Sequence, residues 1–168
     1  MRAMTSSLIA LLLLALAPAA YAQRLVLLVR HAERADGGAS TGTMTKPADP
    51  PLSAAGEARA AKLATMLAGA GLQAIFASEF RRTQDTVKPL SQKLGMAVTT
   101  MRANDTPALV ARLKASHQDD IVLITGHSNT LPEIIKALGG PAVTIADDEY
   151  GDLFVLVPAS GALSRIRY

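Results

Sequence analysis

The chain has 168 residues, which predicts a single domain, large enough for a hydrophobic core and too small for two typical enzyme domains. It contains no cysteine, which excludes disulfides and thiolate metal sites and suits an oxidising compartment. The net charge of +3 comes without a basic run, and aromatic residues make up only 4% of the chain, so the composition argues against nucleic acid as a partner. A small anionic substrate is the simpler expectation.

The N-terminal segment has the features of an export signal. Arg2 precedes an apolar run from Leu8 to Ala17, which has the length of a signal-peptide core and is too short to span a bilayer. Small residues at Ala20 and Ala22 favour cleavage before Gln23, so we expect a signal peptide over residues 1–22 and a mature domain over residues 23–168. The expected product is a secreted, periplasmic protein without a stable membrane anchor after cleavage.

Short apolar runs alternate with segments of helical spacing along the rest of the chain. Strands are predicted at 25–29, 72–78, 96–100, 121–126, 153–157 and 163–166. Helices are predicted over 52–70, from the polar turn after Ser78 to Leu94, from a cap at Asp105 or Thr106 to about Ala115, and from a cap within residues 128–130 to Leu138. Pro89 is expected to bend or break the second helix, and the Gly- and Pro-rich residues 35–51 predict a long loop. The alternation predicts an α/β fold, a three-layer α/β/α sandwich with a mostly parallel central sheet.

Polar side chains stand where three of the predicted strands end. Arg30 and His31 follow the first apolar run, Ser78 ends the second, and His127 follows Gly126 at the end of a later run. Parallel strands bring such ends to one edge of the sheet, where ligands bind in open α/β folds. One Arg-His pair alone would more often be a polar strand exit, but a second strand with a similar ending favours an anion site.

Four short motifs follow one another in a specific order. They are residues 28–33 around Arg30-His31, residues 49–56 with Pro51-Leu52-Ser53 and Gly56, residues 78–86 with Arg82, and residues 126–130 around His127. In this order they resemble the histidine phosphatase superfamily, also called the phosphoglycerate mutase-like family, over nearly all of the expected mature chain. The chain departs from the family pattern at Ala32, where glycine is usual. It also has Ser128 where the acid phosphatase branch carries aspartate, which argues against that branch's substrate handling.

The resemblance implies a phosphoric monoester hydrolase that works through a phosphohistidine on His31. It implies catalytic roles for His31, Arg30, Arg82 and His127, of which Arg30, Arg82 and His127 would bind the phosphate. The residue types suit this chemistry, because charge on a transferring phosphoryl group lies on oxygens that guanidinium groups bind bidentately. No cofactor and no metal is expected, since three histidines without cysteine do not favour a zinc site.

The proton donor for the leaving group stays open among three carboxylates. Glu33, Glu79 and Asp105 are all candidates, and Asp105 is slightly favoured because it follows a predicted edge strand. Of two adjacent arginines, the resemblance places Arg82 in the site and Arg81 on the surface.

Three further polar groups have simpler interpretations. Arg34 could be solvated or line the opening of the site, His117 is interpreted as a solvated loop residue, and residues 147–149 as a solvated acidic turn rather than a cation site.

The combined expectation is an exported, metal-independent phosphatase that acts on a small phosphorylated substrate. Export argues against a mutase. Two alternatives remain: a phosphohistidine or phosphoprotein phosphatase, and a non-catalytic module that binds phosphate without turnover. Hydrolysis of a phosphoprotein but not of small esters would favour the first alternative, and tight phosphate binding without hydrolysis would favour the second.

Overall fold

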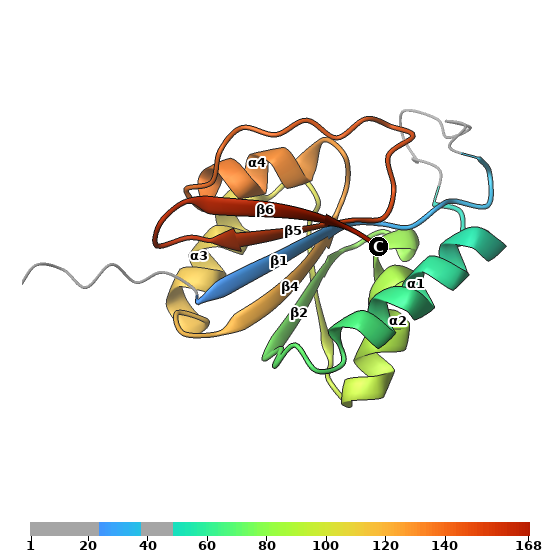
Figure 1. The fold of residues 1–168 in the computed structure, drawn as a ribbon, viewed down its shortest axis with the longest axis horizontal. Coiled ribbons are helices and arrows are strands. Elements are labelled where there is room, and N and C mark those ends of the chain that lie inside the picture. The colour runs from blue at the N-terminus through green and yellow to red at the C-terminus, as the bar shows by residue number, and fades with distance from the viewer. Residues whose placement is uncertain (1–23, 38–48) are drawn as a thin grey trace, which may run out of the picture.

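The computed structural model describes residues 24–37 and 49–168, and a six-stranded sheet forms its centre (Figure 1). The predicted signal peptide and most of the predicted long loop lie outside the described residues. The strands are β1 (Leu25–Arg30), β2 (Ala74–Ser78), β3 (Val98–Met101), β4 (Ile121–Gly126), β5 (Asp152–Val157) and β6 (Ala162–Arg167), and the helices are α1 (Ala54–Leu67), α2 (Arg81–Leu94), α3 (Thr106–Ser116) and α4 (Thr130–Ala137).

The sheet has the strand order β3-β2-β4-β1-β5-β6. The first four strands in the chain run parallel to one another, whereas β5 is antiparallel to both β1 and β6. The predicted α/β class with a mostly parallel sheet is therefore confirmed, and so is the C-terminal hairpin. No helix among residues 24–37 and 49–168 is long and apolar enough to cross a membrane.

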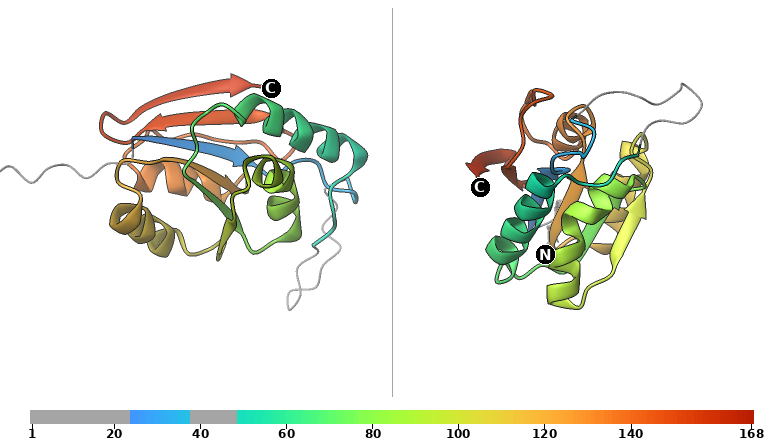
Figure 2. Two further views of the ribbon diagram at one scale, coloured as in Figure 1. Left: turned by 90° about the horizontal axis from the view of Figure 1, so that it is seen from below. Right: turned by 90° about the vertical axis from the view of Figure 1, so that its right-hand side faces the viewer.

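Helices cover both faces of the sheet, which gives the predicted three layers (Figures 1 and 2). Alternate residues of β1 point to opposite faces, so Leu28 packs in a core with α3 and α4 while Leu27 packs in a core with α1 and α2. Both faces of β1 are therefore covered, which is why its sequence is a continuous aliphatic run.

The sequence predicts that Pro89 bends or breaks the second helix, and the structure shows no break there. Helix α2 runs from Arg81 to Leu94 with Pro89 inside it, and it ends at Gly95 in a left-handed conformation, as predicted. Val87 and Leu90 flank the proline and are fully buried, so packing against the core holds the helix together across the missing N–H.

The strand register places the polar strand ends at one edge. Arg30 of β1 lies opposite Gly126 of β4, and Ala77 of β2 lies opposite Thr125 of β4. The His31 amide still donates to the Gly126 carbonyl at 2.9 Å. A Cβ at Gly126 would stand 2.9 Å from a Leu131 methyl carbon, so glycine is what lets α4 start close behind β4.

Candidate active site

A cavity of about 380 Å³ opens at this edge of the sheet, and all four predicted site residues line it. They are Arg30, His31, Arg82 and His127, which come from the ends of β1 and β4 and the first turn of α2. The rings of His31 and His127 lie 5.3 Å apart, centre to centre. The cavity therefore brings together two imidazoles and two guanidinium groups that are distant in the sequence.

His31 is held as a neutral base with a defined tautomer. Its ring is 4% exposed, and Nδ1 lies 2.8 Å from the carbonyl oxygen of Ala32. Because a carbonyl oxygen can only accept, Nδ1 carries the hydrogen and Nε2 carries the lone pair. Burial, reinforced by the charges of Arg82 and Arg30, lowers the pKa of His31 to about 4. At neutral pH the ring therefore offers an Nε2 lone pair, as a nucleophile must.

The backbone after His31 is fixed by contacts with α2 and with the start of α1. The Ala32 amide donates to the Thr86 hydroxyl at 2.9 Å, and the same hydroxyl donates to the Arg82 carbonyl at 2.7 Å. Ser53 donates its amide to the Glu33 carbonyl, and a Cβ at Gly56 would collide with that carbonyl. Glycine in the helix-entry motif thus lets α1 pack directly on the loop that follows His31.

His127 has the opposite hydrogen-bond arrangement. Arg82 can only donate, so its Nη2 at 3.4 Å assigns the lone pair of His127 to Nδ1, and Nε2–H donates to the Ser78 hydroxyl at 2.9 Å. Ser78 donates in turn to Thr83 at 2.8 Å, and Thr83 donates to the Phe80 carbonyl at 2.6 Å. Burial, with the charge of Arg82, lowers the pKa of His127 to about 3.

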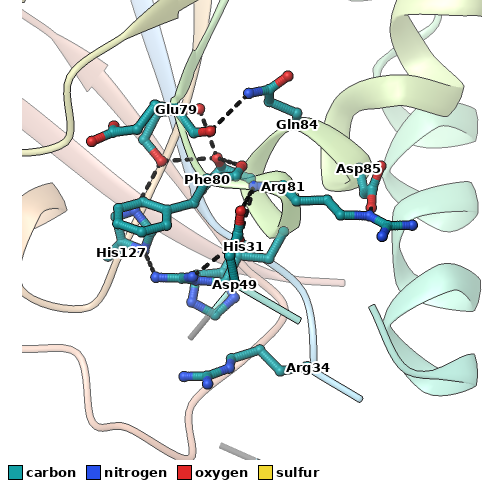
Figure 3. A network of polar contacts seen from close by, with 12 residues as sticks. His31, Arg34, Asp49, Glu79, Phe80, Arg81, Gln84, Asp85 and His127 are labelled. Carbon is teal, nitrogen blue, oxygen red and sulfur yellow. Dashed lines mark hydrogen bonds and ion pairs between the residues drawn. The ribbon is translucent and has the colours of Figure 1, made fainter. Parts of the chain in front are cut away.

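Figure 3 shows the surroundings of this network, with the Phe80 ring lying against His127 and Arg34 standing beside His31. The rings of Phe80 and His127 are 5.2 Å apart and perpendicular. Phe80 also carries the Arg82 guanidinium 4.2 Å above its face. The arginine and the second histidine are thus held by one aromatic ring that sequence reasoning did not single out.

The Arg30 guanidinium is hydrogen-bonded through Nη1, whereas its Nε has no partner among the described residues. Its Nη1 donates to the carbonyls of Ala146 and Glu149 at 2.9 and 2.8 Å, and its plane stacks 4.2 Å from the Tyr150 ring. Its buried Nε–H has no hydrogen-bond partner among residues 24–37 and 49–168. A buried cationic donor of this kind is costly unless a ligand satisfies it, which suits an anion-binding group.

The two adjacent arginines separate as the family resemblance implied. Arg82 lines the cavity with a side chain that is 11% exposed, and it forms an ion pair of 3.5 Å with Asp49. The Arg81 side chain is 62% exposed and pairs with Asp85 at 3.1 Å. Arg34 also lines the cavity, which decides between the two readings of that residue.

None of the three carboxylates considered as proton donors lines the cavity. Glu33 accepts hydrogen bonds from Arg59; burial raises its pKa, but those bonds outweigh burial and hold the pKa below its usual range. Glu79 accepts from the Ala103 amide at 2.7 Å. Asp105, the favoured candidate, caps α3 by accepting from the Ala108 amide and lines a separate small cavity of about 20 Å³.

The cavity carboxylate is instead Asp147, from the turn interpreted in the sequence as simply solvated. Ser128 donates its hydroxyl to Asp147 Oδ1 at 2.9 Å. The turn leads directly into β5, which lies next to β1 in the sheet, and the sequence alone does not give that neighbour relation. His117, interpreted as a loop residue, lies outside the cavity and pairs with Asp120 at 2.8 Å.

Groups of three or more metal-ligating side chains are absent from residues 24–37 and 49–168. The residues that line the cavity offer imidazole, guanidinium, hydroxyl and carboxylate groups. The arrangement can bind a compact anion and attack it with a neutral imidazole nitrogen.

Comparison with known proteins agrees with this arrangement. Residues 26–104 match the family model of the histidine phosphatase superfamily (branch 1), a span that contains Arg30, His31 and Arg82. No curated protein matches the chain.

Many solved structures share the fold. A mycobacterial glucosyl-3-phosphoglycerate phosphatase is 16% identical, with a TM-score of 0.61 over 86% of this chain and 98% of the other. A protein of Escherichia coli assigned as an alpha-ribazole-5'-phosphate phosphatase is 17% identical, with a TM-score of 0.66 over 86% and 95%. A protein of Agrobacterium tumefaciens assigned as the phosphohistidine phosphatase SixA is 20% identical, with a TM-score of 0.63 over 87% and 99%. At these identities the likeness shows the common fold.

Proposed function

We propose that this chain, whose residues 26–104 match the family model of the histidine phosphatase superfamily, is an exported, metal-independent phosphatase that hydrolyses phosphomonoesters through a phosphohistidine on His31. One observation carries the proposal. The Nδ1 of His31 is committed to the Ala32 carbonyl, so the ring keeps its Nε2 lone pair in a cavity that it shares with Arg30 and Arg82. A neutral nucleophile beside two cations is what attack on a phosphate dianion requires.

The reaction divides into two displacements at phosphorus. In the first, Nε2 of His31 forms a bond to phosphorus while the ester P–O bond breaks, and the leaving oxygen takes up a proton. In the second, water attacks phosphorus, the P–N bond breaks, and inorganic phosphate leaves with His31 neutral again. The covalent intermediate replaces one difficult step with two easier ones.

The cations stabilise the phosphoryl oxygens during both steps. Arg30 lines the cavity and its guanidinium is fixed by the bonds of Nη1, so it can bind an oxygen with little reorganisation. Arg82 contributes a second guanidinium from the start of α2. Held by Phe80 and Asp49, it needs little movement to reach a bound anion.

His127 has a role that depends on the substrate's charge. In the unliganded site its Nδ1 accepts from Arg82, so it has no hydrogen to offer on that side. A phosphate dianion that draws Arg82 away raises the pKa of His127, and the protonated ring then donates from Nδ1 to a phosphoryl oxygen. The Ser78 hydroxyl meanwhile keeps Nε2–H oriented.

Export rests on the predicted signal peptide over residues 1–22. The test is cell fractionation followed by sequencing of the mature N-terminus. The proposal expects a periplasmic protein that begins at Gln23, and a cytosolic protein that retains the leader would overturn it.

A phosphohistidine or phosphoprotein phosphatase is the second candidate function. The fold shared with the protein assigned as SixA favours it. Turnover of a phosphohistidine protein at a kcat/KM far above that of small esters would support this candidate.

The deciding experiment is hydrolysis of p-nitrophenyl phosphate with and without a chelator. We expect turnover by the wild type in the presence of chelator and none by His31→Ala. His117→Ala is the matched control, because that histidine lies outside the cavity. Phosphate binding without turnover by the wild type would favour a non-catalytic module, and loss of turnover on chelation would overturn metal independence.

A further inference from the structure

Departure of an alkoxide from phosphorus requires a proton, and the four residues of the proposed mechanism do not supply one. His31 is the nucleophile, His127 and the two arginines bind phosphoryl oxygens, and Glu33 is held ionised by Arg59. Among residues 24–37 and 49–168, Asp147 is the carboxylate that lines the cavity. A carboxyl group in reach of the leaving oxygen can act as a general acid.

Hydrogen bonds tie down the backbone of the turn that carries Asp147. Glu149 donates its amide to the Ala146 carbonyl at 3.0 Å, and the Ala146 amide donates to the Glu149 carboxylate at 2.9 Å. The carbonyls of Ala146 and Glu149, the first and last residues of the turn, both accept a hydrogen bond from Nη1 of Arg30. The phosphate-binding arginine thus fixes the backbone on both sides of Asp147, which ties the position of the carboxylate to the position of the phosphate.

Ser128 orients the carboxyl group itself. Its hydroxyl donates to Asp147 Oδ1 at 2.9 Å, and it follows His127 directly in the chain. With Oδ1 occupied, Oδ2 is the oxygen that can carry and release a proton. The acid phosphatase branch carries an aspartate directly after the second histidine. In this chain Ser128 stands at that position and binds Asp147, which comes from a different loop.

We propose that Asp147, oriented by Ser128 and carried on the turn fixed by Arg30, is the general acid and base of this active site. The inference rests on the proposed phosphatase function and identifies the residue that completes it. In the first displacement the Asp147 proton passes to the ester oxygen as its bond to phosphorus breaks. In the second, the Asp147 carboxylate takes a proton from the attacking water, which returns the carboxyl group to its starting state.

The test compares Asp147→Asn with Asp148→Asn on two esters, p-nitrophenyl phosphate and glycerol phosphate. Nitrophenolate leaves without protonation, whereas the glycerol alkoxide does not. For Asp147→Asn we expect kcat/KM for glycerol phosphate to fall about 100-fold or more, because general acid catalysis contributes roughly 10²–10⁴-fold. The rate at which the aryl ester forms the phosphoenzyme should fall only about threefold, because its leaving group needs no proton. The asparagine keeps an oxygen for the Ser128 hydroxyl. Asp148 lies next in the same turn and is exposed like Asp147, but it does not line the cavity, so its variant should behave as the wild type.

The dependence on leaving group separates proton donation from a structural role, since a distorted cavity would slow both esters alike. Equal effects of Asp147→Asn on the two esters would overturn the inference, and so would a leaving-group-dependent loss in Glu79→Gln or Asp105→Asn in its place. If the wild type hydrolysed both esters and Asp147→Asn did too, only this inference would fail. If the wild type hydrolysed neither, the proposed function would fail and this inference with it.

Discussion

His31 and His127 occupy equivalent places in the fold and are prepared for different tasks. Each follows the last residue of a neighbouring parallel strand, each is nearly buried, and burial lowers the pKa of each, to about 4 and about 3. They differ in the partner of the ring. His31 donates from Nδ1 to a carbonyl, while His127 donates from Nε2 to Ser78 and accepts at Nδ1 from Arg82.

In the proposed mechanism, the hydrogen-bond partners of the two rings, and not their position or pKa, decide which histidine is the nucleophile. The lone pair of His127 is already used, and that of His31 is not. A backbone carbonyl cannot give a proton back, so the tautomer of His31 does not depend on the ligand, whereas Arg82 can leave His127 for a phosphate. In this proposal His31 therefore stays a base whether or not a ligand is bound, whereas His127 becomes a hydrogen-bond donor when an anion draws Arg82 away.

The largest expected effect is that of His31→Ala. Removal of the nucleophile should lower kcat for p-nitrophenyl phosphate by at least about 10⁴-fold, since no covalent intermediate can form. Steady-state kinetics of the purified variant measure it. Should His31→Ala keep more than about a hundredth of wild-type activity, the assignment of His31 as nucleophile would be wrong.

A smaller loss is expected for His127→Ala, because this residue stabilises charge and forms no bond to phosphorus. The expected fall in kcat is about 10²–10³-fold, the range for removing one donor to a developing charge. Phosphoenzyme should still form slowly, which rapid quenching can detect. Loss as complete as in His31→Ala would contradict the division of roles.

Stability should also depend on both rings below neutral pH. Each folded pKa lies below the ordinary value of 6.5, so the unfolded chain binds more protons and the free energy of unfolding decreases as pH falls. The contribution is fully present above about pH 6.5 and is lost toward pH 4 for His31 and pH 3 for His127. Between pH 7.5 and 4.5 we expect a loss on the order of 2 kcal/mol for each ring.

Urea unfolding of the wild type and His31→Asn at these two pH values isolates the part that belongs to His31. The wild type should lose more stability than the variant over this interval, by on the order of 2 kcal/mol. Equal losses would mean that the ring is not held neutral by the fold.

The smallest effect is expected for Ser78→Ala, which removes the acceptor of the Nε2–H of His127. Positioning partners of this kind contribute about tenfold to activity. The alkaline side of the kcat profile should shift to lower pH as well, because His127 acts in its protonated form and loses a hydrogen bond that stabilises that form. Ser164→Ala, on the exposed strand β6, is the control and should change neither value.

The fold and the four cavity residues were predictable for a definite physical reason. Aliphatic runs mark buried parallel strands, and a parallel sheet gathers the polar residues that follow them at one edge, which places His31 and His127 together. Ser78 was found in the same way. These inferences need only local pattern and a rule of topology.

Asp147 could not be found by that reasoning. Its turn is held at the cavity by Arg30, whose bonds to Ala146 and Glu149 join residues more than a hundred positions apart. Nothing in the local sequence distinguishes it from a solvated acidic turn. The tautomers of the two histidines were equally hidden, because they depend on a carbonyl and on Ser78 in three dimensions.

The most direct test of the central claim is to trap the phosphoenzyme. The purified protein is mixed with a ³²P-labelled aryl phosphate, quenched within milliseconds, and its label is tested for stability to acid and alkali. We predict label that survives alkali and is lost in acid, as phosphohistidine is, present in His127→Ala and absent from His31→Ala. Label that is stable to acid, or that persists in His31→Ala, would contradict the account.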